Sequence, residues 1–213
     1  MSVFKRNLTS EIIQNSASKI IKKYKIKSSL EIGCGDFNIS GSLKKIYPKV
    51  LFAGSDISKK AVNLSLKKYP HADIRAGSLF KPWVGHKFDL IISDVSAIND
   101  VAAINSNWYK GIKCNTGLDG LKNVHQIVSK ARNFMNKNGI FIMPLISLSD
   151  IKTHKSLLKQ NFKKITFSKK VEWPLPKKIA KSLINSKINN DFYDIKEVFG
   201  VYIAYTYSVI CKL

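Results

Sequence analysis

The sequence has few cysteines, few acidic residues and no long apolar run. Its three cysteines, Cys34, Cys114 and Cys211, lie far apart, with neither a pairing pattern nor metal-ligand spacing. No apolar run approaches the roughly 20 residues of a membrane-spanning helix, and the opening MSVFKRNLTSEIIQ lacks the apolar core of a signal peptide. These absences exclude a disulfide scaffold and a zinc module. They predict a cytoplasmic protein with reduced thiols, no bound metal and no membrane partner.

The scarcity of acidic residues leaves a large positive charge. The 213 residues include 36 lysines and arginines against 14 aspartates and glutamates, a net charge of +22. Such a charge suits a polyanionic partner such as RNA. Only three of the basic residues are arginines, however, and arginine is the residue preferred for bidentate phosphate contacts. Because Lys, Asn and Ile are all abundant, AT-rich coding is a second explanation, and both stay open.

Apolar periodicity predicts an α/β protein. Residues 10–25 place their apolar side chains on one helical face, so they predict an N-terminal lead-in helix with Ser10 as its N-cap. Five short apolar runs, at 29–33, 50–58, 72–80, 88–96 and 139–146, alternate with helical segments, the last of which covers 121–136. This alternation is typical of a parallel sheet with helices on both faces.

The C-terminal part has a different pattern. Residues 162–173 and 201–213 alternate between apolar and polar, as paired antiparallel strands do, and a helical insertion is expected between them at about 174–199. The expected fold class is therefore α/β, with a doubly wound, mostly parallel seven-stranded sheet and an antiparallel edge. One domain over residues 1–213 accounts for the whole pattern.

A glycine-rich turn follows the first predicted strand. In Glu31-Ile32-Gly33-Cys34-Gly35, the two glycines would let a ligand approach the backbone where strand meets helix. About twenty residues on, Asp56 ends the second strand, where a carboxylate can accept both hydroxyls of a ribose. The turn lacks the third glycine of G-x-G-x-x-G, so a nicotinamide-dependent oxidoreductase is the less favoured alternative.

Three segments together resemble the class I S-adenosylmethionine (SAM) methyltransferases, over roughly residues 25–148. Residues 29–35 (SLEIGCG) are similar to the first motif of that family, residues 53–58 (AGSDIS) to its ribose-binding motif, and residues 88–94 (FDLIISD) to the strand that ends at the active site. The resemblance implies a Rossmann-like methyltransferase fold with SAM as the cofactor.

Within that family, the chain is most similar to the release-factor glutamine methyltransferase group. The resemblance rests on residues 116–121 (TGLDGL), which are similar to the glycine-rich DGL segment of that group. Two positions differ from the pattern. Asp94-Val95-Ser96-Ala97 stands in place of Asn-Pro-Pro-Tyr, and Ser78 stands where relatives usually have an aspartate that accepts the adenine amino group.

The resemblance assigns an expected role to each motif. The expected cofactor-binding residues are Glu31, Gly33, Cys34, Gly35, Asp56, Ile57, Ser78 and Leu79. Asp94 is the expected catalytic residue, because open α/β sheets bind ligands at the carboxyl ends of their strands. A capping or cofactor-binding role for Asp94 stays open. The expected substrate-binding residues, most of them in the long loop after the fourth strand, are Ser96, Asn99, Trp108, Tyr109 and Trp173, although Trp108 could instead anchor its loop to the core.

The leading hypothesis is a SAM-dependent methyltransferase that transfers a methyl group to a nitrogen or oxygen of a small molecule or peptide. One alternative is an RNA or protein methyltransferase that uses the basic surface, with nucleic acid as partner. Another is a binding module that keeps the fold without catalysis. Neither the acceptor nor the oligomeric state is predicted by the sequence.

Overall fold

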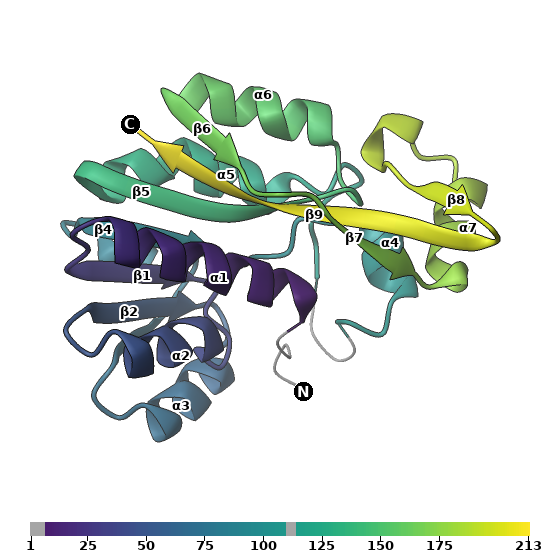
Figure 1. The fold of residues 1–213 in the computed structure, drawn as a ribbon. Helices are drawn as coiled ribbons and strands as arrows, with labels where there is room; N and C mark the ends of the chain where they lie inside the picture. The colour runs from purple at the N-terminus through teal and green to yellow at the C-terminus, as the bar shows by residue number, and fades with distance from the viewer. Residues whose placement is uncertain (1–6, 110–113) are drawn as a thin grey trace.

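The computed structural model describes residues 7–109 and 114–213, and none of the helices in those two ranges is long and apolar enough to cross a membrane. Its centre is a sheet with the strand order β3-β2-β1-β4-β5-β9-β6 (Figure 1). These strands are β1 (Ser28–Ile32), β2 (Leu51–Asp56), β3 (Asp73–Ala76), β4 (Phe88–Ser93), β5 (Met135–Ile146), β6 (Lys164–Phe167) and β9 (Val201–Lys212). The first five pair in parallel, and β9 runs antiparallel to β5 and β6. The expected fold class, α/β with a mostly parallel sheet and an antiparallel edge, is confirmed, but the described sheet has nine strands and not the expected seven, because two further strands pair with β9.

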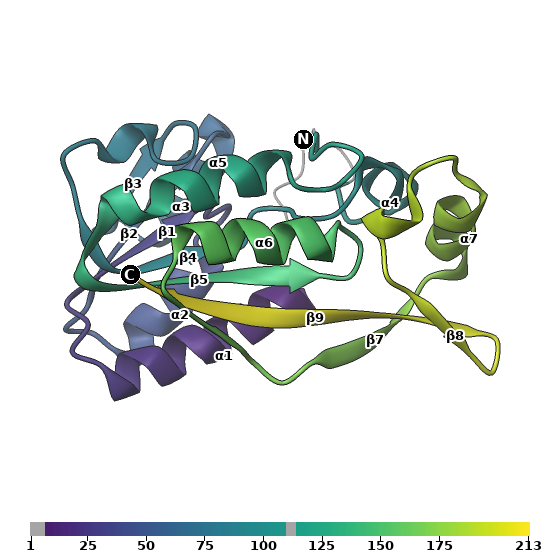
Figure 2. The same cartoon turned by 90° about the horizontal axis from the view of Figure 1, so that it is seen from above.

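Helices cover both faces of this sheet. On one face lie α1 (Leu8–Lys23), α2 (Asn38–Ile46) and α3 (Lys59–Lys68), whose apolar side chains share one core cluster. On the other lie α5 (Lys122–Ala131) and α6 (Ile151–Asn161), which share a second cluster. Figure 2 shows α5 and α6 on the opposite side of the sheet from α1 and α2.

The consecutive apolar residues 90–92 of β4 (Phe88–Ser93) are explained by burial on both faces of the sheet. Leu90 and Ile92 pack in the cluster under α1 and α2, whereas Ile91 packs in the cluster under α5. Successive side chains of a strand point to opposite faces, so a strand covered on both faces needs apolar residues at every position. Parallel pairing, with Ile32 of β1 opposite Ser93 of β4, places the carboxyl ends of the two strands side by side.

Two element boundaries differ from the sequence expectation. Helix α5 ends at Ala131, and β5 already begins at Met135, which pairs with Phe88 of β4. The Asn136 side chain supports this start of the strand by donating a hydrogen bond of 2.7 Å from Nδ2 to Asp89 Oδ1. The segment 162–173 is two strands, β6 and β7 (Val171–Leu175), separated at Ser168, where the main chain bonds to Ser208 of β9. Both pair with β9.

Strand β9 has 12 residues and pairs with different strands along its two halves. Its second half pairs with β5 and β6, and its first half pairs with β7 and β8 (Lys196–Val198). This first half of β9, together with β7, β8, α4 (Asp100–Asn105) and α7 (Lys177–Asn185), forms a unit that we call the extension. The extension encloses a third apolar cluster. Figures 1 and 2 show the extension projecting past the carboxyl end of β5.

The extension corrects two expectations. The segment 174–199, expected to be a helical insertion, contains α7, a short 3-10 turn at Asn190–Phe192 and strand β8. The stretch after β4, expected to be one long loop, contains α4. These short elements are stabilised by packing against each other, which local periodicity does not report.

Candidate functional site

A cavity of about 500 Å³ lies at the carboxyl ends of β1, β2 and β4. Parallel strands bring their carboxyl ends to one edge of the sheet, so the turns that follow them meet there. Its wall contains every residue that the sequence predicts for the cofactor, namely Glu31, Gly33, Cys34, Gly35, Asp56, Ile57, Ser78 and Leu79. The wall also contains Asp94, Ser96 and Tyr109, and Ser10 of α1, which the sequence predicted only as a helix cap.

The glycine turn is shaped by backbone angles and by a close neighbour. Gly33 and Gly35 have φ angles of +68° and +52°, a region that other residues rarely adopt. A Cβ atom on Gly33 would lie 2.5 Å from Cγ2 of Val95, the residue after Asp94. Glycine at position 33 therefore lets the turn after β1 approach the turn after β4.

The amide groups of this turn are already used inside the protein. The N–H groups of Gly33 and Cys34 both donate to the carbonyl oxygen of Ser55, at 2.8 and 3.0 Å, and that of Gly35 donates to Oδ2 of Asp56 at 2.9 Å. A pyrophosphate site needs such amides to be free, since they are its principal hydrogen-bond donors. These three amides are thus unavailable for a phosphate group.

Asp56 is held at the end of β2 by two backbone donors. Besides the bond from Gly35 to Oδ2, the N–H of Ser58 donates to Oδ1 at 2.8 Å. Each carboxylate oxygen has two lone pairs, so each can still accept a hydrogen bond from a ligand. The two donors hold the Asp56 side chain at the position where the sequence predicts ribose binding.

Glu31 is a buried carboxyl group in the cavity wall, with 2% of its surface exposed. Burial raises its pKa to about 8, the negative charges of Asp94 and Asp36 act in the same direction, and hydrogen bonding from Ser40 opposes them. The backbone N–H of Ser40 donates to Oε2 at 2.9 Å. At neutral pH, without a ligand, the protonated form of Glu31 predominates.

Asp94 lies where β4 ends, and α1 reaches across the sheet to it. The Ser10 hydroxyl donates a hydrogen bond of 2.5 Å to Oδ2 of Asp94. Ser10 is in the first turn of α1, where its N–H donates to the N-cap side chain of Asn7. The N-cap of α1 is therefore Asn7 and not Ser10, which the sequence predicted. Burial raises the pKa of Asp94 to about 6, and the bond from Ser10 opposes that shift.

A second polar group stands beside Asp94 in the cavity wall. The hydroxyl oxygens of Ser96 and Tyr109 are 2.7 Å apart, and the Cys114 Sγ donates to Ser96 Oγ at 3.6 Å. Burial raises the pKa of both Tyr109 and Cys114, so these groups are neutral at physiological pH. Together they can offer hydrogen bonds but no charge.

Three residues predicted for substrate lie outside this cavity wall. Asn99 is the N-cap of α4, where its side chain accepts from the N–H of Ala102 at 2.8 Å and donates to the Phe192 carbonyl at 2.9 Å. The rings of Trp108 and Trp173 meet edge to face, 5.9 Å apart, and pack on the core of the extension. These positions support the anchoring alternative for Trp108.

The charge of the cavity is opposite to that of the chain. Four carboxyl groups line it, those of Glu31, Asp36, Asp56 and Asp94. None of the described residues in its wall is a lysine, arginine or histidine, although the chain has 36 lysines and arginines. Such a cavity attracts a cationic ligand and repels an anionic one.

Comparison with known proteins shows that this fold is shared with solved methyltransferase structures. No family model and no curated protein sequence matches the chain. Among solved structures, it is similar to the ribosomal protein L11 methylase from Lactobacillus delbrueckii subsp. bulgaricus, with 12% identity and a TM-score of 0.56 over 97% of this chain and 80% of that one.

Two further structures show the same likeness. The YcgJ protein from Bacillus subtilis is 10% identical, with a TM-score of 0.59 over 94% of this chain and 97% of that one. The plantazolicin methyltransferase BpumL, solved with a triazolic desmethylPZN analog and SAH, is 11% identical, with a TM-score of 0.55 over 95% of this chain and 83% of that one.

Proposed function

We propose that the protein is a single-domain SAM-dependent methyltransferase that transfers a methyl group to a nitrogen or oxygen of a small molecule or peptide. The observation that carries this proposal is the acidic cavity at the carboxyl ends of β1, β2 and β4, inside a chain of charge +22. SAM has a cationic sulfonium and an ammonium group, so a cavity lined by carboxyl groups is suited to it.

The residues present fit SAM group by group. Asp56 would accept the ribose hydroxyls, and the turn of Gly33 would bring the backbone against the ligand. The Ser78 hydroxyl could accept one hydrogen bond from the adenine amino group, in the turn where Leu79 has a φ of +50°. Glu31 would provide negative charge inside the cavity. Similarity to BpumL, whose structure contains SAH, supports the same ligand class.

For methyl transfer, the protein mainly has to align the acceptor with the methyl group. When bound, SAM supplies an activated methyl group, and the reaction is an in-line displacement at its carbon. Asp94 would orient the acceptor and accept its proton, held in place by the hydroxyl of Ser10. The neutral pair Ser96 and Tyr109 would help to exclude water and to position the acceptor.

The two observations on the glycine turn and the cavity disfavour the oxidoreductase alternative. The amides of residues 33–35 are used within the protein, and the aspartate side chains that line the cavity would repel a pyrophosphate. A nicotinamide dinucleotide would therefore bind poorly.

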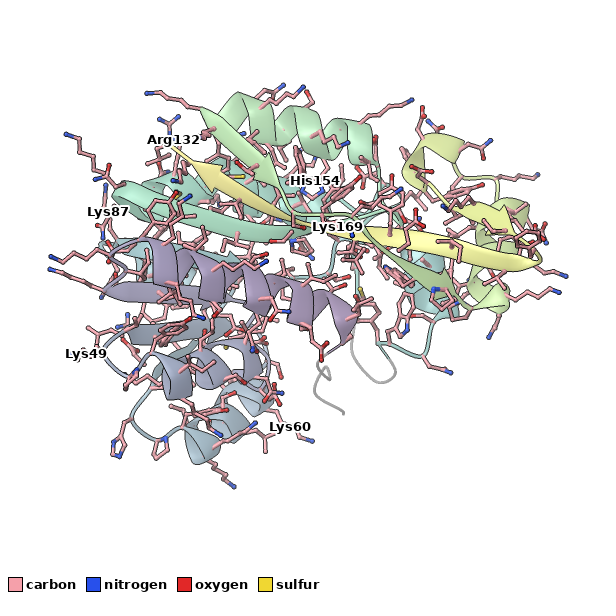
Figure 3. All side chains as sticks on the ribbon, in the orientation of Figure 1. Lys49, Lys60, Lys87, Arg132, His154 and Lys169 are labelled. Atoms are coloured by element: carbon pink, nitrogen blue, oxygen red, sulfur yellow. The ribbon has the colours of Figure 1, made fainter. Side chains whose placement is uncertain are left out.

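The basic surface does not favour a nucleic-acid substrate over a small one. Figure 3 shows cationic side chains on several sides of the molecule, and the labelled ones come from separate helices, turns and loops: Lys49, Lys60, Lys87, Arg132 and Lys169. A nucleic-acid site normally gathers its basic residues on one face. We therefore retain an RNA or protein acceptor as the second candidate only.

Equilibrium binding tests the proposal. Calorimetry should detect binding of SAM and of its demethylated product S-adenosylhomocysteine (SAH), and no binding of NADH at the same concentrations. Failure to bind either SAM or SAH would overturn the proposed cofactor. Binding of NADH in their place would support the oxidoreductase alternative.

A further inference from the structure

We propose that the methyl acceptor is an amine, and that its N–H groups bind the Asp94 carboxylate through Oδ1. The inference rests on the proposed function, because it names the acceptor class of the same cavity. Neither the fold nor the similar structures distinguish a nitrogen acceptor from an oxygen acceptor.

The two oxygens of Asp94 have different surroundings. Oδ2 accepts the hydrogen bond from Ser10, whereas Oδ1 accepts none from the residues that the structure describes. Asp94 lines the cavity, so Oδ1 can accept a hydrogen bond from a molecule bound there. A carboxylate oxygen is an acceptor only, and its natural partner is therefore an N–H or O–H donor.

The neighbouring polar groups do not supply a competing charge. Ser96 and Tyr109 are hydrogen-bonded to each other, and the thiol of Cys114 donates to Ser96. The described part of the cavity wall has no lysine, arginine or histidine that could stabilise an anionic acceptor. Asp94 is the charged group of this polar cluster.

The sign of the charge that develops during transfer decides between nitrogen and oxygen. An amine becomes a cation as it takes the methyl group, and the carboxyl groups of Asp94, Glu31 and Asp36 favour that change. A phenol or a carboxylic acid reacts through its anion, which the same groups would repel.

The amine loses a proton before it takes the methyl group. The acceptor enters as R–NH₃⁺ and gives one proton to Asp94, which passes it to solvent. The lone pair of R–NH₂ then forms the bond to the methyl carbon, and the electrons of the breaking sulfur–carbon bond stay on sulfur. The products are R–NH₂⁺–CH₃ and neutral SAH, with one proton released overall.

The experiment uses the full-length protein with SAM that contains a deuterated methyl group. It is incubated with a small-molecule and peptide extract of cells, and mass spectrometry with fragmentation locates the label. We expect the label on amine nitrogen. A label on oxygen or carbon would overturn the inference and leave the proposed function intact. No labelled product despite SAM binding would overturn catalysis itself, and no SAM binding would overturn the proposed cofactor.

Variants then link the result to Asp94. Asp94→Asn keeps the shape of the side chain and should lower turnover of the labelled amine about 10²-fold or more, the scale of a general acid–base group. The matched control is Asp191→Asn, an exposed carboxylate that pairs with Lys152 on the surface. It should keep wild-type turnover. If Asp94→Asn methylates the amine as fast as this control, Asp94 does not bind the acceptor, and the inference fails.

Discussion

The hydroxyl of Ser10 donates a hydrogen bond of 2.5 Å to Oδ2 of Asp94, across 84 positions of sequence. The bond links the first turn of α1 to the end of β4. It favours the ionised carboxylate, against the burial that raises the pKa of Asp94 to about 6. Ser10 is thus a positioning residue, since it acts on the reaction through Asp94.

Replacing Ser10 tests that role through a pH profile. Ser10→Ala removes the donor, so the pKa of Asp94 should rise above its value of about 6. Since the ionised form binds the acceptor, the rising limb of kcat/KM against pH should move to higher pH. Ser10→Thr keeps a hydroxyl and should restore the wild-type profile. A profile unchanged in Ser10→Ala would show that the bond is only structural.

Cofactor binding should release a proton from Glu31. The pKa of Glu31 is about 8 without ligand, so at pH 7 the side chain is mostly protonated. A cationic ligand in the cavity favours the carboxylate and lowers this pKa, so the proton leaves on binding. Calorimetry of SAM binding at pH 7, in buffers of different ionisation enthalpy, should report this release. Glu31→Gln cannot release a proton, and an equal release from that variant would contradict the assignment.

Histidine 154 should make the fold sensitive to acid. Its side chain is fully buried on α6, and neither ring nitrogen has a hydrogen-bond partner among the described residues (Figure 3). Burial lowers its pKa to about 4, the charge of His125 acts in the same direction, and Asp150 opposes both. The neutral ring is compatible with the fold, so stability is full above about pH 6.5, the unfolded pKa, and falls as pH drops toward 4.

The loss should amount to about 3 kcal/mol between pH 7 and pH 4, by the linkage of pKa to stability. Urea unfolding at a series of pH values measures it. His154→Leu removes the titrating group and should flatten this part of the curve, without losing stability at pH 7 because no hydrogen bond is broken. An equally steep curve in that variant would assign the acid sensitivity to other groups.

The hairpin between β8 and β9 carries a residue that its backbone disfavours. Phe199 and Gly200 form a two-residue turn with φ angles of +48° and +77°, and the Phe199 side chain is fully exposed. Asn is preferred at the first position of such a turn. Phe199→Asn should therefore stabilise the protein by about 0.5–1 kcal/mol, or roughly 1–4 °C in Tm. Phe199→Ala, which lacks this preference, should show no comparable gain.

The sequence predicted the sheet and the cavity better than the extension, for physical reasons. Strands β1 to β5 are buried on both faces, so their apolar runs are visible without knowledge of their partners. The turn containing Gly33 and Gly35 likewise has a local cause in its positive φ angles. Helix α4 has six residues and packs against α7, and no local pattern reports a partner more than 70 residues away.

Ser10 and Asn99 show the same limit at the level of single side chains. The sequence predicted Ser10 as the N-cap of the lead-in helix and Asn99 as a substrate-binding residue. Asn99 caps α4, whereas Ser10 reaches the Asp94 carboxylate because the first turn of α1 lies beside the end of β4. The difference lies in the contact between two elements distant in sequence, which the sequence does not encode locally.

Calorimetric titration of SAM into the wild-type protein and Asp56→Ala tests the central claim most directly. The carboxylate is placed to hold the ribose, so Asp56→Ala should weaken SAM binding by about 1.5–3 kcal/mol, roughly 10- to 150-fold, the scale for hydrogen bonds to a charged group. Asp73→Ala, an exposed carboxylate on β3 that pairs with Arg75, is the control and should bind SAM as the wild type does. Equal affinity of Asp56→Ala and Asp73→Ala for SAM, with both variants folded by circular dichroism, would contradict the account.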